Sequence, residues 1–173
     1  MRPFTESPFF VANPLQAGAL VRLRQAATFP GGLAVLSGGP GVGKSAFLRQ
    51  ALAPVAADVR LVPVDLRGGD PADFTETLLA VLDGGAPATL RSVLGARRAA
   101  GQALVIALDI TGLNVELARR LLRLMHAVDE QQAPVSLVLM GPHTLHPLLD
   151  VAGLIQLRQR LSFRLKLRPL TLL

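Results

Sequence analysis

The sequence contains no cysteine, no tryptophan and no tyrosine. The absence of cysteine excludes disulfides and thiolate metal sites. The three histidines, His126, His143 and His146, are too scattered to indicate a zinc centre. Without tryptophan or tyrosine, the chain has few side chains on which nucleic-acid bases could stack. Redox chemistry, zinc chemistry and base stacking are therefore not indicated.

Long hydrophobic runs are also missing. No apolar run approaches the roughly 18 residues needed to span a bilayer, and the N-terminus lacks the basic and apolar regions of a signal peptide. We therefore expect a cytoplasmic, soluble protein with one domain over residues 1–173. Hydrophobic residues nevertheless make up 50% of the chain, which favours an α/β fold with strands buried on both faces.

Lysine is scarce, because only Lys44 and Lys166 among the 18 basic residues are lysine. The net charge of +6 leaves open an attraction to the DNA backbone or to another anionic surface. The arginines at 97–98 and 119–123 have the spacing of a solvated helix face, which is the simpler interpretation of them. Since arginine serves almost everywhere else, Lys44 needs a specific explanation.

Lys44 lies in a glycine-rich stretch, LSGGPGVGKSAF, that fits the pattern G-x-x-x-x-G-K-[ST] in full. A short apolar run precedes it and a helical pattern follows it, as a phosphate-binding P-loop requires. Glycines let the backbone N–H groups turn toward phosphates, Lys44 would reach the β- and γ-phosphates, and Ser45 would bind Mg²⁺. The predicted ATP-binding residues are Gly38, Gly39, Pro40, Gly41, Val42, Gly43, Lys44, Ser45 and Ala46.

Five apolar runs alternate with helical patterns along the chain, as in a mainly parallel α/β sheet. Three helix starts carry capping signals, at Asn13, Asp70 and Asn114. Pro63 places the second run at a sheet edge, and alternating apolar and basic residues place the fifth run at the other edge. The expected strands are 32–37, 59–64, 103–109, 134–140 and 162–167, and the expected helices are 14–28, 44–53, 71–82, 89–100, 115–131 and 145–157.

The sequence resembles the ExeA-type AAA+ ATPases, which serve bacterial secretion and pilus assembly and have relatives among transposition ATPases. Beyond the P-loop, the similar segments are SPFFVANPLQAGALVRL, LVLMGPHTL and LRQRLSFRLKLRPLT, in the order in which the family has them. The resemblance implies a three-layer P-loop sandwich with strand order 5-1-4-3-2, which agrees with the two edges inferred above. The family continues after the PLT segment into a helical lid, whereas this sequence stops at Leu173, so the expectation is either that the lid is absent or that the sequence is an excised core.

Within this resemblance, Asp109 matches the Walker B aspartate at the carboxyl end of the third strand, where it would hold Mg²⁺. Asp65 is the rival carboxylate. Asp109 is favoured because an edge strand that contains proline should lie farther from the P-loop. A helix cap or turn is the alternative role for either residue.

The catalytic positions of the family depart from its pattern here. The family follows its Walker B aspartate with a glutamate that orients the attacking water, and this sequence has Ile110. A polar sensor of the γ-phosphate is replaced by Pro142, with His143 or Thr144 as the candidate substitute. Glu116 is a further candidate to approach the site, although its simpler interpretation is a place in the first helical turn after Asn114, where a carboxylate suits the helix dipole. Slow ATP hydrolysis is therefore expected, and a glutamate at position 110 should raise the rate if that side chain faces the nucleotide.

Arg160 matches the arginine with which the family contacts the nucleotide of a neighbouring subunit, so self-association through this residue is expected. A solvated helix end is the alternative. The sequence thus predicts an ATP·Mg²⁺-binding AAA+ core that couples nucleotide state to the assembly of a secretion or pilus machine. The alternatives are a nucleotide-gated binding module with little hydrolysis and a DNA-associated ATPase of the transposition kind.

Overall fold

The computed structural model describes residues 14–68, 70, 73–83 and 89–168. Their five strands form one parallel sheet in the order β2-β3-β4-β1-β5, which is the predicted order read from the other edge. The strands are β1 (Leu33–Ser37), β2 (Val59–Asp65), β3 (Ala103–Asp109), β4 (Val135–Gly141) and β5 (Leu161–Lys166). The α/β fold class and the strand order are therefore confirmed.

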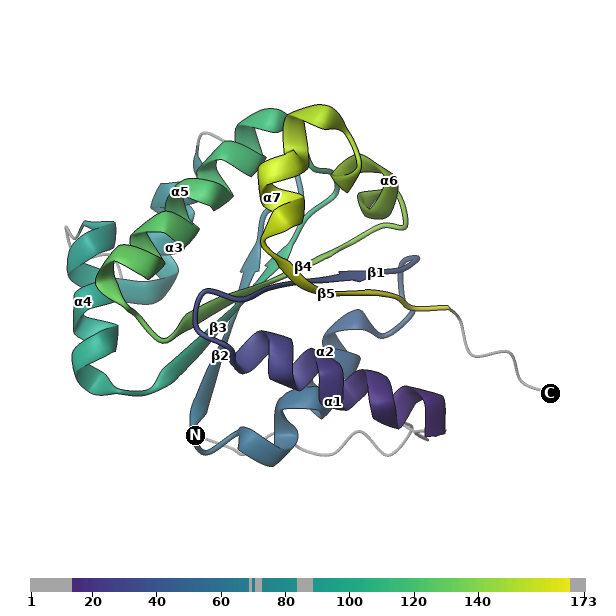
Figure 1. The fold of residues 1–173 in the computed structure, drawn as a ribbon, viewed down its shortest axis with the longest axis horizontal. Coiled ribbons are helices and arrows are strands. Elements are labelled where there is room, and N and C mark those ends of the chain that lie inside the picture. Colours follow the sequence, from purple (N-terminus) through teal and green to yellow (C-terminus); the bar gives the residue numbers. More distant parts are fainter. Residues whose placement is uncertain (1–13, 69, 71–72, 84–88, 169–173) are drawn as a thin grey trace.

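Helices cover both faces of the sheet and make three layers (Figure 1). One face carries α1 (Pro14–Thr28) and α2 (Lys44–Leu52), the latter followed by the short 3-10 helix η1 (Ala53–Val55). The other face carries α3 (Phe74–Asp83), α4 (Leu90–Ala100), α5 (Val115–Gln131), α6 (Leu145–Leu149), the 3-10 helix η3 (Ala152–Leu154) and α7 (Ile155–Gln159).

The interior strands β1, β3 and β4 supply a core on each face of the sheet. Successive residues of a strand point to opposite faces. In β1, Leu33 and Val35 accordingly pack under α5, whereas Ala34 and Leu36 pack against α1 and α2. Every residue of β1 and β4 is buried, which explains the continuous apolar runs in the sequence.

The two edge strands keep the features that predicted their positions. Pro63 is exposed in β2, where a missing N–H costs no ladder hydrogen bond on the open side. Along β5, half-buried residues alternate with exposed ones. The N-cap at Asn114 is also confirmed, because its Oδ1 accepts a 2.8 Å hydrogen bond from the Leu117 N–H. Asn13 lies outside the described residues, as do residues 71–72 that follow the predicted cap at Asp70, and α3 is described from Phe74 onward.

One predicted helix is wrong in its extent. The pattern over 145–157 predicts a single helix, but the structure divides it into α6, η3 and α7. The break falls at Val151, whose backbone is extended with φ −71° and ψ 138°. Short helices therefore connect β4 to β5. Within the described residues, no helix is long and apolar enough to cross a membrane.

Candidate functional site

The chain between β1 and α2 makes a glycine turn at the carboxyl end of β1. Gly41 and Gly43 adopt positive φ angles of 71° and 89°, which side chains with a Cβ rarely tolerate. Gly38 is constrained by space instead, because an added Cβ would lie 2.5 Å from Val42 Cγ1 and 3.2 Å from the carbonyl oxygen of Leu167. The turn thus brings backbone and the N-terminus of α2 together around an open space.

Lys44, the first residue of α2, folds back over this turn. Its Nζ donates hydrogen bonds to the carbonyl oxygens of Gly38 and Gly39, each at 3.0 Å. The ammonium group is therefore held at the mouth of the turn by two neutral acceptors. A phosphate oxygen is a stronger acceptor for an ammonium group than a neutral carbonyl.

A cavity of about 520 Å³ opens beside the turn at the carboxyl ends of β1, β3 and β4. Ligands of open α/β sheets bind at this edge, and the volume falls within the roughly 300–1,000 Å³ of small-molecule sites. Of the predicted ATP-binding residues, Gly39 and Val42 are not among the described residues that line it. The lining consists of Gly38, Pro40, Gly41, Gly43, Lys44, Ser45, Ala46, Arg67, Asp109, Ile110, Thr111, Gly141 and Pro142.

The two candidate carboxylates end neighbouring strands, and only one of them lines the cavity. Asp65 and Asp109 are directly paired in the register of β2 and β3. The side chain of Asp109 is 28% exposed and contributes to the cavity wall, whereas that of Asp65 is 58% exposed and is absent from the described lining. The cavity therefore joins Asp109, and not Asp65, to Lys44 and Ser45.

Asp65 is instead bound to Arg67. Arg67 Nε donates to Asp65 Oδ1 at 3.0 Å, and a terminal guanidinium nitrogen donates to Oδ2 at 2.7 Å. The backbone N–H of Arg67 adds a 2.9 Å hydrogen bond to Oδ1. These hydrogen bonds, the side-chain ones first, lower the pKa of Asp65 to about 2. Asp65 thus remains ionised and fixes the guanidinium.

Arg67 is a cavity residue that the sequence analysis missed. It lines the cavity, and its Nε lies 3.8 Å from Asp109 Oδ2. The sequence offered one indication of this role. Arg67 follows Asp65 by two residues, just beyond the carboxyl end of a predicted strand, and the P-loop also follows the carboxyl end of a strand. No motif marks this position.

Ile110 belongs to the apolar core although it is counted in the cavity wall. The residue is 2% exposed and lies in the core cluster with Leu113 and Leu145. Its N–H donates to the Met140 carbonyl at 2.8 Å, which fixes the backbone here. The side chain therefore packs in the core beside the cavity, and a glutamate at this position would have to leave the core to reach a nucleotide.

The proposed substitutes for the missing polar groups lie outside the described cavity lining. Glu116 sits in the first turn of α5, as its simpler interpretation required, with its Oε1 3.0 Å from Arg120 Nε. His143 and Thr144 follow Pro142, which does line the cavity. Among the described residues, no group of three or more His, Asp or Glu side chains could hold a metal ion by itself.

Arg160 lies at the amino ends of the strands, whereas the P-loop lies at their carboxyl ends. It immediately precedes β5, whose six residues run parallel to β1 toward the P-loop, a length of roughly 20 Å at ~3.3 Å per residue. Its guanidinium pairs with Asp129 Oδ2 at 2.5 Å. Arg160 therefore lies too far from the cavity of its own chain to contact it. This distance does not test a contact with the cavity of a neighbouring chain.

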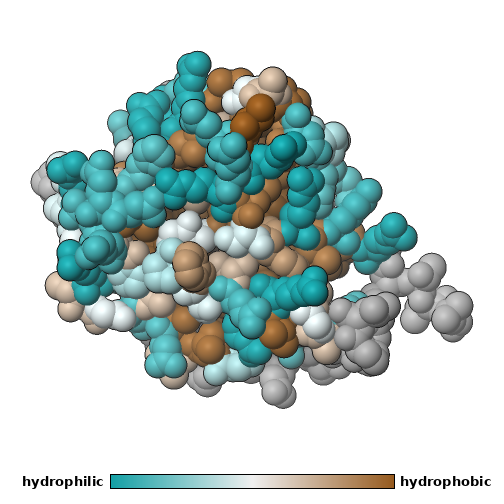
Figure 2. Space-filling model, in the orientation of Figure 1, coloured by the Kyte–Doolittle hydropathy of each residue, from teal (hydrophilic) through white to brown (hydrophobic). Residues whose placement is uncertain are grey.

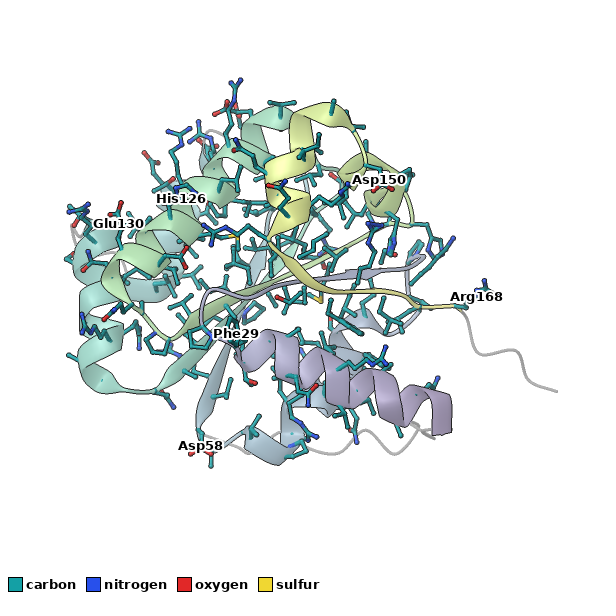
Figure 3. All side chains as sticks on the ribbon, in the orientation of Figure 1. Phe29, Asp58, His126, Glu130, Asp150 and Arg168 are labelled. Atoms are coloured by element: carbon teal, nitrogen blue, oxygen red, sulfur yellow. The ribbon has the colours of Figure 1, made fainter. Side chains whose placement is uncertain are left out.

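Two of the histidines lie near each other and the third lies apart. Figure 3 places His126 on α5, whereas His143 lies just before α6 and His146 within it, close enough to affect each other electrostatically.

No protein-family model matches the sequence, and no match was found among curated proteins. Solved structures do match it. The Aeropyrum pernix ORC2 protein, in ADPNP and ADP complexes, has a TM-score of 0.63 at 15% identity over 96% of this chain and 50% of its own. In the HORMA:CdnC:Trip13 complex of E. coli MS115-1, the matching chain has a TM-score of 0.57 at 14% identity, over 90% of this chain and 59% of its own.

The DnaC helicase loader is similar over nearly its whole length, with 14% identity and a TM-score of 0.53 over 92% of this chain and 94% of its own. This chain spans only half to three-fifths of the ORC2 and HORMA-complex chains that it matches. At such low identities the likeness concerns the fold alone. The chain therefore shares an α/β fold with these solved structures, built on a parallel sheet in the order β2-β3-β4-β1-β5.

Proposed function

We propose that this chain binds ATP together with Mg²⁺ in the cavity at the carboxyl edge of the sheet and acts as an AAA+ ATPase core. The observation that carries the proposal is the meeting of Lys44, Ser45 and Asp109 in one cavity beside the glycine turn. The three residues come from two different elements, α2 and β3.

The residues present fit this ligand. The glycine turn and the start of α2 present backbone N–H groups, which favour anions. Lys44 would exchange its two carbonyl acceptors for phosphate oxygens. Ser45 and Asp109 would hold Mg²⁺, which, when bound, neutralises charge on the phosphates. Asp109 supplies a carboxylate and Ser45 a hydroxyl, the oxygen ligands that Mg²⁺ prefers.

Hydrolysis is expected to be slow. The cavity wall described here contains one carboxylate, Asp109, which is assigned to the metal. A second carboxylate for the attacking water is absent from that wall, and loss of a positioned base typically lowers rates by about 10² to 10⁴. A nucleotide-gated binding module, which changes state without rapid turnover, therefore remains the alternative within the same site.

The substitution Lys44→Ala tests nucleotide binding. Loss of a charge-assisted contact with two phosphates should lower ATP affinity by about 100-fold while the fold remains intact. Lys166→Ala is the matched control, because Lys166 is exposed on β5 and outside the cavity wall. Titrations with ATP and GTP would also determine the base preference. Equal ATP affinity in a folded Lys44→Ala variant would refute the site.

The cellular role proposed from the sequence resemblance is coupling of nucleotide state to assembly of a secretion or pilus machine. A DNA-associated ATPase is the second candidate, because the solved structures of similar fold include Drosophila ORC bound to DNA. Exposed arginines on α4 and α5 support it, namely Arg98, Arg119 and Arg123. Figure 2 shows hydrophilic residues gathered over this region.

A DNA-binding titration at several salt concentrations, with and without ATP, separates the two roles. Neutralisation of phosphates by arginines predicts that log affinity falls linearly with log salt concentration. Binding that ATP strengthens would favour the DNA-associated role, and no binding at low salt would exclude it.

A further inference from the structure

We propose that Arg67 distinguishes nucleoside triphosphate from diphosphate by contacting the terminal phosphate from within the same chain. This inference rests on the proposed function, because it assigns a specificity-determining role to a residue of the ATP cavity. Arg67 is not part of the P-loop pattern or of the Walker B strand.

The position of Arg67 is the first argument. Among the described residues that line the cavity, Lys44 and Arg67 are the basic ones. Lys44 is held at the glycine turn by its contacts with Gly38 and Gly39. Arg67 enters from the end of β2, on the side of Asp109. The cavity therefore has a positive group on each of two walls.

The anchoring of the guanidinium is the second argument. Asp65 accepts hydrogen bonds from Nε and from one terminal nitrogen of Arg67, and a further hydrogen bond from its backbone N–H. A guanidinium carries five N–H donors in a rigid plane, so a bidentate partner on one side sets the direction of the remaining donors. Asp65 is accordingly a positioning residue that acts through Arg67.

The contact with Asp109 is the third argument. Its 3.8 Å length is much longer than the 2.7 Å contact with Asp65, so it is the weaker of the two ion pairs. The side chain of Arg67 is 56% exposed, so a ligand can reach it while Asp65 holds it in place. Phosphate oxygens could therefore replace Asp109 as its second partner, and Asp109 would become available to a cation.

A purely structural surface pair between Asp65 and Arg67 makes a different prediction. Such a pair would affect ATP and ADP equally, because it would not touch either nucleotide. A contact with the terminal phosphate affects ATP alone. Comparing the two affinities therefore separates the roles without relying on hydrolysis.

The experiment measures ATP and ADP affinity in the presence of Mg²⁺ for wild type, Arg67→Ala, Arg67→Lys and Asp65→Asn. Arg67→Ala should weaken ATP binding by about 10- to 100-fold, the range for a hydrogen bond to a charged group, and should leave ADP binding nearly unchanged. Arg67→Lys should restore only part of the ATP affinity. The lysine keeps the positive charge but lacks the planar guanidinium that can bind two oxygens at once. Asp65→Asn should produce a smaller, ATP-selective loss.

Arg91→Ala is the matched control. Arg91 on α4 forms an exposed ion pair with Glu130 on α5 at 2.7 Å, outside the described cavity wall. It should change neither affinity. Equal losses of ATP and ADP affinity in Arg67→Ala, or no loss of either, would overturn the inference while ATP binding by wild type stands. If wild type binds neither nucleotide, the proposed function itself is overturned and this inference with it.

Discussion

The position after Asp109 gives the sharpest test of the site, because sequence and structure lead to different outcomes for Ile110→Glu. From the resemblance alone, the substitution should create a base for the attacking water and raise hydrolysis. In the structure, Ile110 is 2% exposed in the core beneath α5 and α6. We therefore expect the substitution to destabilise the protein without raising the rate of phosphate release.

The magnitude follows from two contributions. Replacing a buried isoleucine with a polar side chain forfeits about 1.5–3 kcal/mol of hydrophobic burial. The new carboxylate must also either lose hydration or take up a proton, so burial raises its pKa. If its pKa rises by about 2–3 units, linkage adds about 3–4 kcal/mol of destabilisation at pH 8.

The sign of the pH dependence follows from the raised pKa. Below the unfolded-state value of about 4.3, the carboxyl is protonated in both folded and unfolded chains and the electrostatic cost disappears. As the pH rises from there to the folded-state pKa, the unfolded chain releases its proton first, and stability falls. The penalty is therefore small at pH 4 and complete above the folded-state pKa.

Urea unfolding at pH 4.5 and pH 8 measures this effect, with Ile110→Gln as the control of matched shape and no charge. Both variants should lose stability, and the additional loss in Ile110→Glu should be large only at the higher pH. Steady-state phosphate release should be recorded on the same proteins. A folded Ile110→Glu variant with wild-type stability and faster phosphate release would show that the side chain faces the nucleotide, and would refute this reasoning.

Three further predictions concern single contacts. If Arg160 reaches a neighbour's nucleotide, the light-scattering mass of wild type should rise with ATP and that of Arg160→Ala should not, with Arg158→Ala as the control. Asn114→Ala removes the N-cap hydrogen bond of α5 and should lower the free energy of unfolding by about 1 kcal/mol. The carboxyl of Asp65 should titrate near pH 2 in an NMR experiment and move toward 3.8 in Arg67→Ala. The depressed pKa means that this pair is complete above about pH 4 and is lost as the pH falls through about 2.

These three predictions have distinct refutations. A wild type that stays monomeric with ATP at high concentration would remove support for a shared interfacial site. Unchanged stability in Asn114→Ala would mean that water replaces the cap at no cost. A midpoint for Asp65 near 3.8 in wild type would show that Arg67 does not hold it in solution.

The sequence by itself determined the features that depend on local chemistry. The glycine turn before Lys44 needs backbone angles that few residues other than glycine adopt, so its pattern is visible without the fold. The identity of the two edge strands followed from Pro63 and from the alternation along β5, because an edge strand tolerates proline and exposed side chains. The order of the three interior strands was expected only from the family resemblance. The cap at Asn114 follows from the same kind of local signal.

Tertiary structure decided which residues meet across the sheet. The register of β2 and β3 sets Asp65 beside Asp109, 44 positions later in the chain, and so brings Arg67 into the cavity. The burial of Ile110 depends on the packing of α5 and α6 against the sheet. The residues next to Ile110 in the sequence do not predict this packing. Spacing along one strand specifies which residues share a face, whereas contacts between strands depend on register and helix packing, and these are fixed only when the whole sheet forms.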